Sequence, residues 1–87
     1  MPELTLLRKA QLRDTLYYAH PNSGASHDTA TGVIVGVVGG LMAAGDLDYL
    51  PALRIVAQHW PRGGRIQCVP PAWRADLEKL LKEVPHA

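Results

Sequence analysis

The chain has little of what several kinds of small protein depend on. Phenylalanine is absent from its 87 residues, and Cys68 is the only cysteine. A single thiol cannot cross-link a small secreted scaffold. The first residues carry Glu3 and then basic side chains, where a signal peptide would have a positive start and an apolar run. We therefore expect a cytoplasmic protein.

An excess of one charge is also missing. Nine basic residues face eight acidic ones, which gives a net charge of +1. This balance offers no general attraction for nucleic acid or for an anionic membrane. The apolar fraction of 47% is typical of a folded domain, and the length suits one domain over residues 1–87.

No pattern of catalytic or metal-binding residues stands out. The four histidines, His20, His27, His59 and His86, share no spacing typical of zinc ligands. Cys68 lies beside two prolines in a predicted extended segment, and we expect a buried, unreactive thiol. The sequence predicts no metal, no cofactor and no enzymatic activity.

What the chain does have is a charge-free middle, from Thr29 to Ala44. Its small residues fall four apart, a spacing that places them in one stripe on an α-helix, where another backbone can approach closely. The opposite side repeats bulky residues. We predict a helix over 29–44, capped by Asp28 and ended by Gly45. The stripe consists of Gly32, Gly36, Gly40 and Ala44, and the bulky side of Ile34, Val38 and Leu41.

A strand over Val33–Val38 is the alternative for this segment. Valine and isoleucine favour strands, and each interior glycine costs a helix about 1 kcal/mol relative to alanine. As a helix, the segment is apolar on all sides and must be buried. The glycine stripe is then covered either within the chain or by the same stripe of a second copy, and Gly36→Leu would be severely disruptive.

Membrane insertion of this middle segment is not expected. The 17 uncharged residues of Thr29–Gly45 are at the lower limit for spanning hydrocarbon. Acidic residues flank them where lysine or arginine normally anchors a spanning helix. We therefore expect no contact with a membrane.

Three further helices are predicted from apolar faces with helical spacing. They cover Leu4–Ala19, with Thr5 as a candidate cap, Tyr49–Trp60, capped by Asp46 or Asp48, and Pro71–Val84. Residues 65–69 alternate polar and apolar and are predicted to be extended. The fold class is all-α, a small four-helix domain around a central Gly-rich buried helix, with an α+β fold containing a strand at 33–38 as the alternative. The apolar faces are Leu12, Leu16 and Ala19 in the helix over 4–19; Leu50, Leu53, Val56, Ala57 and Trp60 in the helix over 49–60; and Trp73, Leu77, Leu80, Leu81 and Val84 in the helix over 71–84.

Surface residues are the remaining candidates for function. Tyr17 and Tyr18 end the first helix, where an exposed tyrosine near Arg8 or Arg13 would anchor a partner. Four arginines, together with His59, could form one basic patch: Arg54, Arg62, Arg65 and Arg74. The leading hypothesis is a small non-enzymatic binding or inhibitor protein that acts by surface contact on a protein partner, with a homodimer suiting so short a chain. Such proteins include inhibitors that phages and mobile elements direct against host machinery.

Two other functions are kept as alternatives. The basic patch could bind nucleic acid, through phosphate contacts from the arginines. The loop Ser23–Thr29, at the start of the central helix, could hold a nucleotide phosphate. Ordinary helix capping explains the same loop residues.

Overall fold

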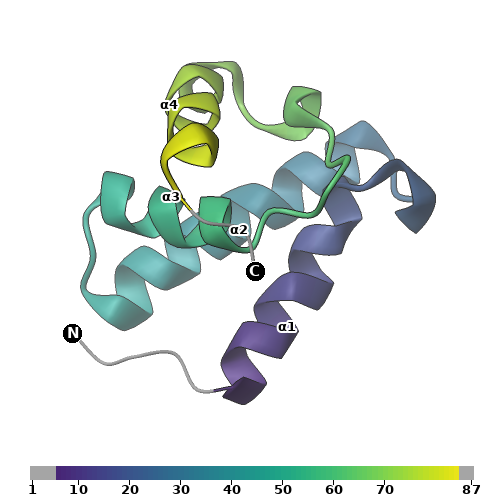
Figure 1. Ribbon diagram of the computed structural model, residues 1–87. Helices are drawn as coiled ribbons and strands as arrows, with labels where there is room; N and C mark the ends of the chain where they lie inside the picture. Colours follow the sequence, from purple (N-terminus) through teal and green to yellow (C-terminus); the bar gives the residue numbers. More distant parts are fainter. Residues whose placement is uncertain (1–5, 85–87) are drawn as a thin grey trace.

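The computed structural model describes residues 6–84 and contains four α-helices, with no strand in that range. Figure 1 shows their arrangement. The all-α prediction is confirmed and the strand at 33–38 is wrong. Leu4 and Thr5, the first two residues of the predicted first helix, lie outside the described residues. The helices are α1 (Leu6–Leu16), α2 (His27–Gly45), α3 (Tyr49–Gln58) and α4 (Pro71–Glu83), with 3-10 turns η1 (Tyr17–Ala19), η2 (Pro21–Ser23) and η3 (Ile66–Cys68).

Helix α2 is longer at both ends than predicted. Its N-cap is Ser26, whose Oγ accepts a hydrogen bond from the Thr29 amide at 3.2 Å, so Asp28 lies in the first turn instead. At the other end Gly45 stays helical, and Asp46 takes the left-handed conformation with φ 50°. Aspartate is one of the few non-glycine residues that tolerate this conformation, which is why the predicted end was one residue early.

The core lies between α3 and its neighbours. Helix α3 packs against α2 and α4, and α1 packs against α2 (Figure 1). Leu50, which we placed on the apolar face of α3, is 54% exposed, because it lies in the first turn at the edge of the buried side. The predicted faces otherwise hold: the largest fully buried side chains are Leu16, Ile34, Leu53, Leu77, Val38, Val56, Val69 and Cys68.

The segment 65–69 is not extended. A hydrogen bond from the Cys68 amide to the Arg65 carbonyl, at 2.9 Å, closes the turn η3. Cys68 and Val69 are both buried, although they are adjacent in sequence. A strand sends adjacent side chains to opposite faces and could not bury both in this core. The turn does so, and the expectation of a buried Cys68 is confirmed.

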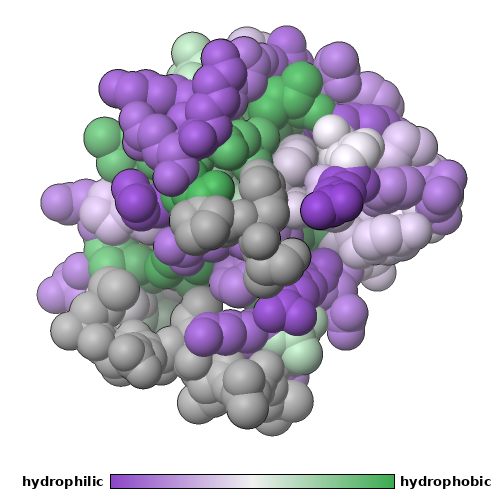
Figure 2. Space-filling view, viewed as in Figure 1, coloured by the Kyte–Doolittle hydropathy of each residue, from purple (hydrophilic) through white to green (hydrophobic). Residues whose placement is uncertain are grey.

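Helix α4 is amphipathic, as predicted. Leu77 and Val84 are buried, and Trp73, Leu80 and Leu81 pack partly buried against the core. Hydrophilic side chains cover the outer side of α4 in the space-filling view, and hydrophobic ones show along its inner edge (Figure 2). The helix therefore closes one side of the core.

A polar contact joins α3 and α4 at their partly buried edge. The Tyr49 hydroxyl donates a hydrogen bond to Asp76 Oδ2 at 3.2 Å, and its ring lies 5.6 Å from that of Trp73. Burial raises the pKa of Tyr49 to about 12, and the hydrogen bond and negative charge of Asp76 add to the effect. The neutral phenol is the form that this contact holds.

Because of this contact, the stability of the fold should decrease at alkaline pH. The pKa of Tyr49 is higher in the folded chain than its ordinary value of 10.0, so the folded state holds the proton more tightly. The stabilisation is complete below pH 10.0 and is lost as the pH rises to about 12. Melting temperatures measured across that range should fall more steeply for the parent than for Tyr49→Phe. Equal falls in the two proteins would contradict the assignment.

Helix α2 is not buried on all sides, and that expectation is wrong for the single chain. Only Ala30, Ile34 and Val38 are buried in it. All four residues of the predicted stripe, Gly32, Gly36, Gly40 and Ala44, are exposed.

No other part of the described chain packs closely on the glycines of this stripe. A Cβ atom added to Gly32, Gly36 or Gly40 would meet nothing within 4 Å, so residues 6–84 do not provide the expected cover from within the chain. The severe disruption expected of Gly36→Leu has no basis in the monomer. The close approach that requires glycine is at Gly64, where an added Cβ would lie 2.7 Å from Trp60 Nε1.

Candidate functional site

Two surface features are candidates for function, and the first is the outer side of α2. We call the uncovered residues on this side the bare α2 face. They are all exposed, and they point away from the side of the helix on which Ile34 and Val38 are buried. None carries a charge. Val35, 43% exposed, is one of the few large hydrophobic residues on the surface. The bare α2 face consists of Gly32, Val35, Gly36, Gly39, Gly40 and Ala43.

Among the described residues, α2 is also the one helix long and apolar enough to cross a membrane. The core helix of a soluble protein can meet the same criterion, so the finding is weak by itself. Its position does not resemble that of a core helix, however, since 17% of the apolar window is buried. The bare α2 face is therefore an apolar surface that the described chain leaves uncovered.

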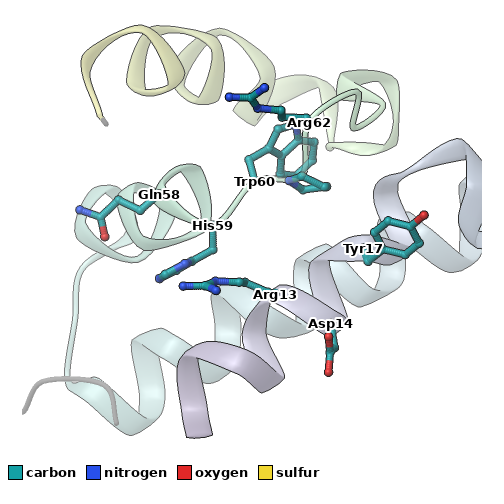
Figure 3. A pocket seen from close by; sticks show the side chains of 8 residues that line it. Arg13, Asp14, Tyr17, Gln58, His59, Trp60 and Arg62 are labelled. Carbon is teal, nitrogen blue, oxygen red and sulfur yellow. The ribbon is translucent and has the colours of Figure 1, made fainter. Parts of the chain in front are cut away.

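The second feature is a groove of about 330 Å³ between α1 and the end of α3. Helix α1 supplies Arg13 and Asp14, and η1 supplies Tyr17. The segment that ends α3 supplies the opposite wall, where Pro61 and the following turn direct the chain away. Figure 3 shows Arg13 reaching toward the ring of His59, Arg62 beside Trp60, and Asp14 pointing away from both. The lining residues are Arg13, Asp14, Tyr17, Gln58, His59, Trp60, Pro61 and Arg62.

The basic groove, as we call these eight residues, has a positive electrostatic environment. Burial lowers the pKa of His59 below its ordinary value, and the positive charges of Arg13 and Lys9 lower it further. Its Nδ1 atom is buried without a hydrogen-bond partner among the described residues. Arg13 and Arg62 are both exposed, and neither guanidinium group has a hydrogen-bond or ion-pair partner within the described part of the chain.

Two of the predicted partner-binding residues lie in the basic groove. Tyr17, 44% exposed, and Arg62 both line the basic groove. Tyr18 is 46% exposed but does not line it, and Arg54 lies exposed on α3 outside it. One face of the Tyr17 ring is stacked on His20, with centroids 5.0 Å apart.

The guanidinium groups of Arg65 and Arg74 both form hydrogen bonds within the fold, and neither residue lines the basic groove with Arg62. The guanidinium group of Arg65 donates to the carbonyl oxygens of Ala19, Tyr18 and Ala25 at 3.1, 3.2 and 3.1 Å. Arg74 donates to the carbonyls of Val69 and Gln67, both at 2.9 Å. Carbonyl oxygens left exposed by tight turns need such donors, and sequence spacing does not reveal them.

The loop before α2 uses its hydroxyl groups internally. Ser23 Oγ donates to the Tyr18 carbonyl at 3.1 Å and accepts from the Ala25 amide at 3.2 Å. Ser26 caps α2 through the Thr29 amide. These contacts favour the capping interpretation of Ser23–Thr29 over a phosphate site. No group of three or more His, Cys, Asp or Glu in the described residues could hold a metal ion.

Sequence reasoning placed His59 with the arginines and Arg13 beside the tyrosines, but it did not join these two groups of residues. A weak signal was present for Arg13, which precedes Tyr17 by four residues and so shares its side of the helix. His59 and Arg62 join them only because the end of α3 lies near α1, which no local pattern predicts.

In comparisons with known proteins, no family model, no curated protein and no solved structure matches this chain.

Proposed function

We propose that this is a small non-enzymatic binding protein that acts by surface contact, and that the bare α2 face is where it pairs with a second copy of itself. The observation that supports the proposal is an uncharged helix face with open space over every glycine of the stripe. Helix α2 is about 28 Å long, which gives the two copies a long line of contact.

The cost of glycine argues that another backbone covers this face. An exposed glycine within a helix costs about 1 kcal/mol relative to alanine. Gly32, Gly36 and Gly40 gain nothing in return within the described fold, since no neighbour there would contact a side chain at these positions. Small residues four apart are useful where two helices approach closely, which a second α2 would do.

The absence of charge argues that this second backbone belongs to another copy. A two-fold axis places the same surface on both sides of the contact, so a charged face would meet its own charge. The bare α2 face has no charge to repel its counterpart or to select an acidic or basic partner. Asp28, Asp46 and Asp48 are at its ends, where lysine or arginine would favour a lipid surface.

Sedimentation velocity over a concentration series tests the pairing. We expect a monomer–dimer equilibrium in the parent and a melting temperature that rises with protein concentration. Val35→Glu should leave a folded monomer, since it places a charge on the bare α2 face. Leu50→Glu is the matched control, because it puts the same charge at another exposed large apolar residue, on α3.

Gly36→Ala provides a second test, because its expected effects on the stability of the monomer and on the association of the dimer have opposite signs. In the monomer it should add up to about 1 kcal/mol of stability, because alanine favours the helix and its Cβ meets nothing. In the dimer the same Cβ would separate the two backbones and weaken the association. A parent that stays monomeric throughout the series, or that binds neutral lipid vesicles through the same face, would overturn the pairing.

A further inference from the structure

The His59 ring lies between α1 and the end of α3 without the partners that a charged imidazole requires. His59 follows the last residue of α3, and it lines the basic groove. Its Nδ1 atom is buried and has no hydrogen-bond partner among the described residues. A neutral imidazole carries one N–H group, whereas the protonated ring carries an N–H on both nitrogens. Protonation therefore leaves a charged N–H group buried without an acceptor, which is costly.

Two cations of α1 face the same ring. Figure 3 shows the Arg13 guanidinium group reaching across the groove to the His59 ring. Lys9 precedes Arg13 by four residues, so it lies on the same side of α1, one turn earlier, and it is partly buried. Neither side chain has a hydrogen-bond or ion-pair partner in the part of the chain that the structure describes. Both positive charges therefore act on the ring without a bound counter-ion.

The other polar groups around the groove do not offset these cations. Asp14 lines the groove but points away from His59, and the Arg62 guanidinium lies beyond Trp60 (Figure 3). Tyr17, from η1, contributes a phenol and no charge, and no residue of α2 lines the groove. A proton on His59 is therefore a third positive charge at this boundary, with no carboxylate of the described residues directed toward it.

The effect on folding has a definite sign. Burial lowers the pKa of His59 below its ordinary value of 6.5, and the positive charges of Arg13 and Lys9 lower it further. The unfolded chain, in which the ring is solvated, binds this proton more tightly than the folded chain. The stabilisation is therefore complete above pH 6.5 and is lost as the pH falls below that value.

We propose that His59 makes the contact of α1 with the end of α3 an acid-sensitive switch, in which a proton on the ring repels Lys9 and Arg13 and opens the basic groove. Helix α1 packs mainly on α2 and η1, and those contacts hold it while its side facing α3 moves away. Trp60, which lines the groove and is 8% exposed, then becomes accessible to water. The switch does not depend on the pairing of α2.

Fluorescence of Trp60 on the full chain tests the switch. Trp60 and Trp73 are the two tryptophans, so a Trp73→Phe background isolates the signal. From about pH 7.5 to about pH 5.5, where histidine is the side chain that ordinarily titrates, we expect a shift of the emission to longer wavelength and stronger quenching by acrylamide. The helical circular dichroism should stay constant. The closing equilibrium should weaken by up to about tenfold per pH unit, the limit for one proton.

Three variants assign the change to this cluster. His59→Gln should abolish it, because an amide takes up no proton in this range. Arg13→Gln and Lys9→Gln should each reduce it, because one positive charge fewer faces the protonated ring. His27→Gln is the matched control, since it removes an exposed histidine at the start of α2 and should behave like the parent.

Three outcomes would overturn the proposal. The first is an unchanged Trp60 emission in the parent across this range. The second is a full change in both Arg13→Gln and Lys9→Gln, an outcome that remains measurable if His59→Gln does not fold. The third is an equal reduction in His27→Gln, which would mean that the overall gain of positive charge is responsible.

Discussion

Leu53→Ala should remove a large part of the free energy of unfolding of this protein. Leu53 is fully buried in α3, the helix that packs against both α2 and α4. Removing a buried leucine side chain costs about 2–5 kcal/mol, through lost burial and the cavity left behind. A chain of 87 residues has a stability of only about 5–10 kcal/mol to lose. Chemical denaturation followed by circular dichroism measures the change.

Leu50→Ala is the control for this experiment, with the same substitution three residues earlier in the same helix. Leu50 is 54% exposed, and its truncation should change the free energy of unfolding by less than about 0.5 kcal/mol. The sequence placed both leucines on one apolar face. Similar losses in the two variants would mean that Leu50 is covered, which the monomeric fold excludes.

Arg65→Ala should be the most damaging change of a charged residue. Its guanidinium group connects η1 with the loop before α2, through hydrogen bonds to Ala19, Tyr18 and Ala25. Ala19 and Tyr18 keep other donors, the Arg65 amide and Ser23 Oγ, so the loss falls mainly on Ala25. We expect a cost of about 2 kcal/mol, since hydrogen bonds from charged donors are stronger than neutral ones.

Two variants separate the contribution of the planar guanidinium group of Arg65 from the contribution of its positive charge. Arg65→Lys keeps the charge but cannot reach three carbonyls with a planar fork, and it should recover only part of the loss. Arg62→Ala removes a nearby arginine that has no partner in the described chain, and it should cost less than about 0.5 kcal/mol. An Arg65→Ala variant as stable as Arg62→Ala would show that the three contacts contribute nothing.

The order of elements could be predicted because each helix carries its own local signal. Apolar residues repeat at helical spacing in α1, α3 and α4, and Pro21, Pro61 and Pro70 separate the segments. The boundary errors are also local. Asp46 could end α2 because aspartate tolerates a left-handed backbone, a choice that depends on how the next residues pack. The turn η3 depends on burying Cys68 and Val69 together, which alternation of polarity does not predict.

The candidate sites, in contrast, are made of residues that lie far apart in the sequence. Arg65 and Arg74 look like surface charges in the sequence, and only the folded chain presents backbone carbonyls to them. The basic groove joins residues 13–17 to residues 58–62, and no spacing connects those two segments. The spacing showed that the glycine stripe is unusual and predicted which side of α2 carries the bulky residues. It did not show what covers the other side.

The amino-acid order alone determined an all-helical domain, the side of each helix that would be apolar, and the absence of charge along α2. Helical period and residue size decide these properties, and both are local. Only the tertiary structure decided that three residues of α2 are buried while the glycines of its stripe are exposed, and which arginines are bound to carbonyls. Those outcomes depend on contacts between segments far apart in the chain, where packing and unsatisfied backbone groups outweigh any local preference.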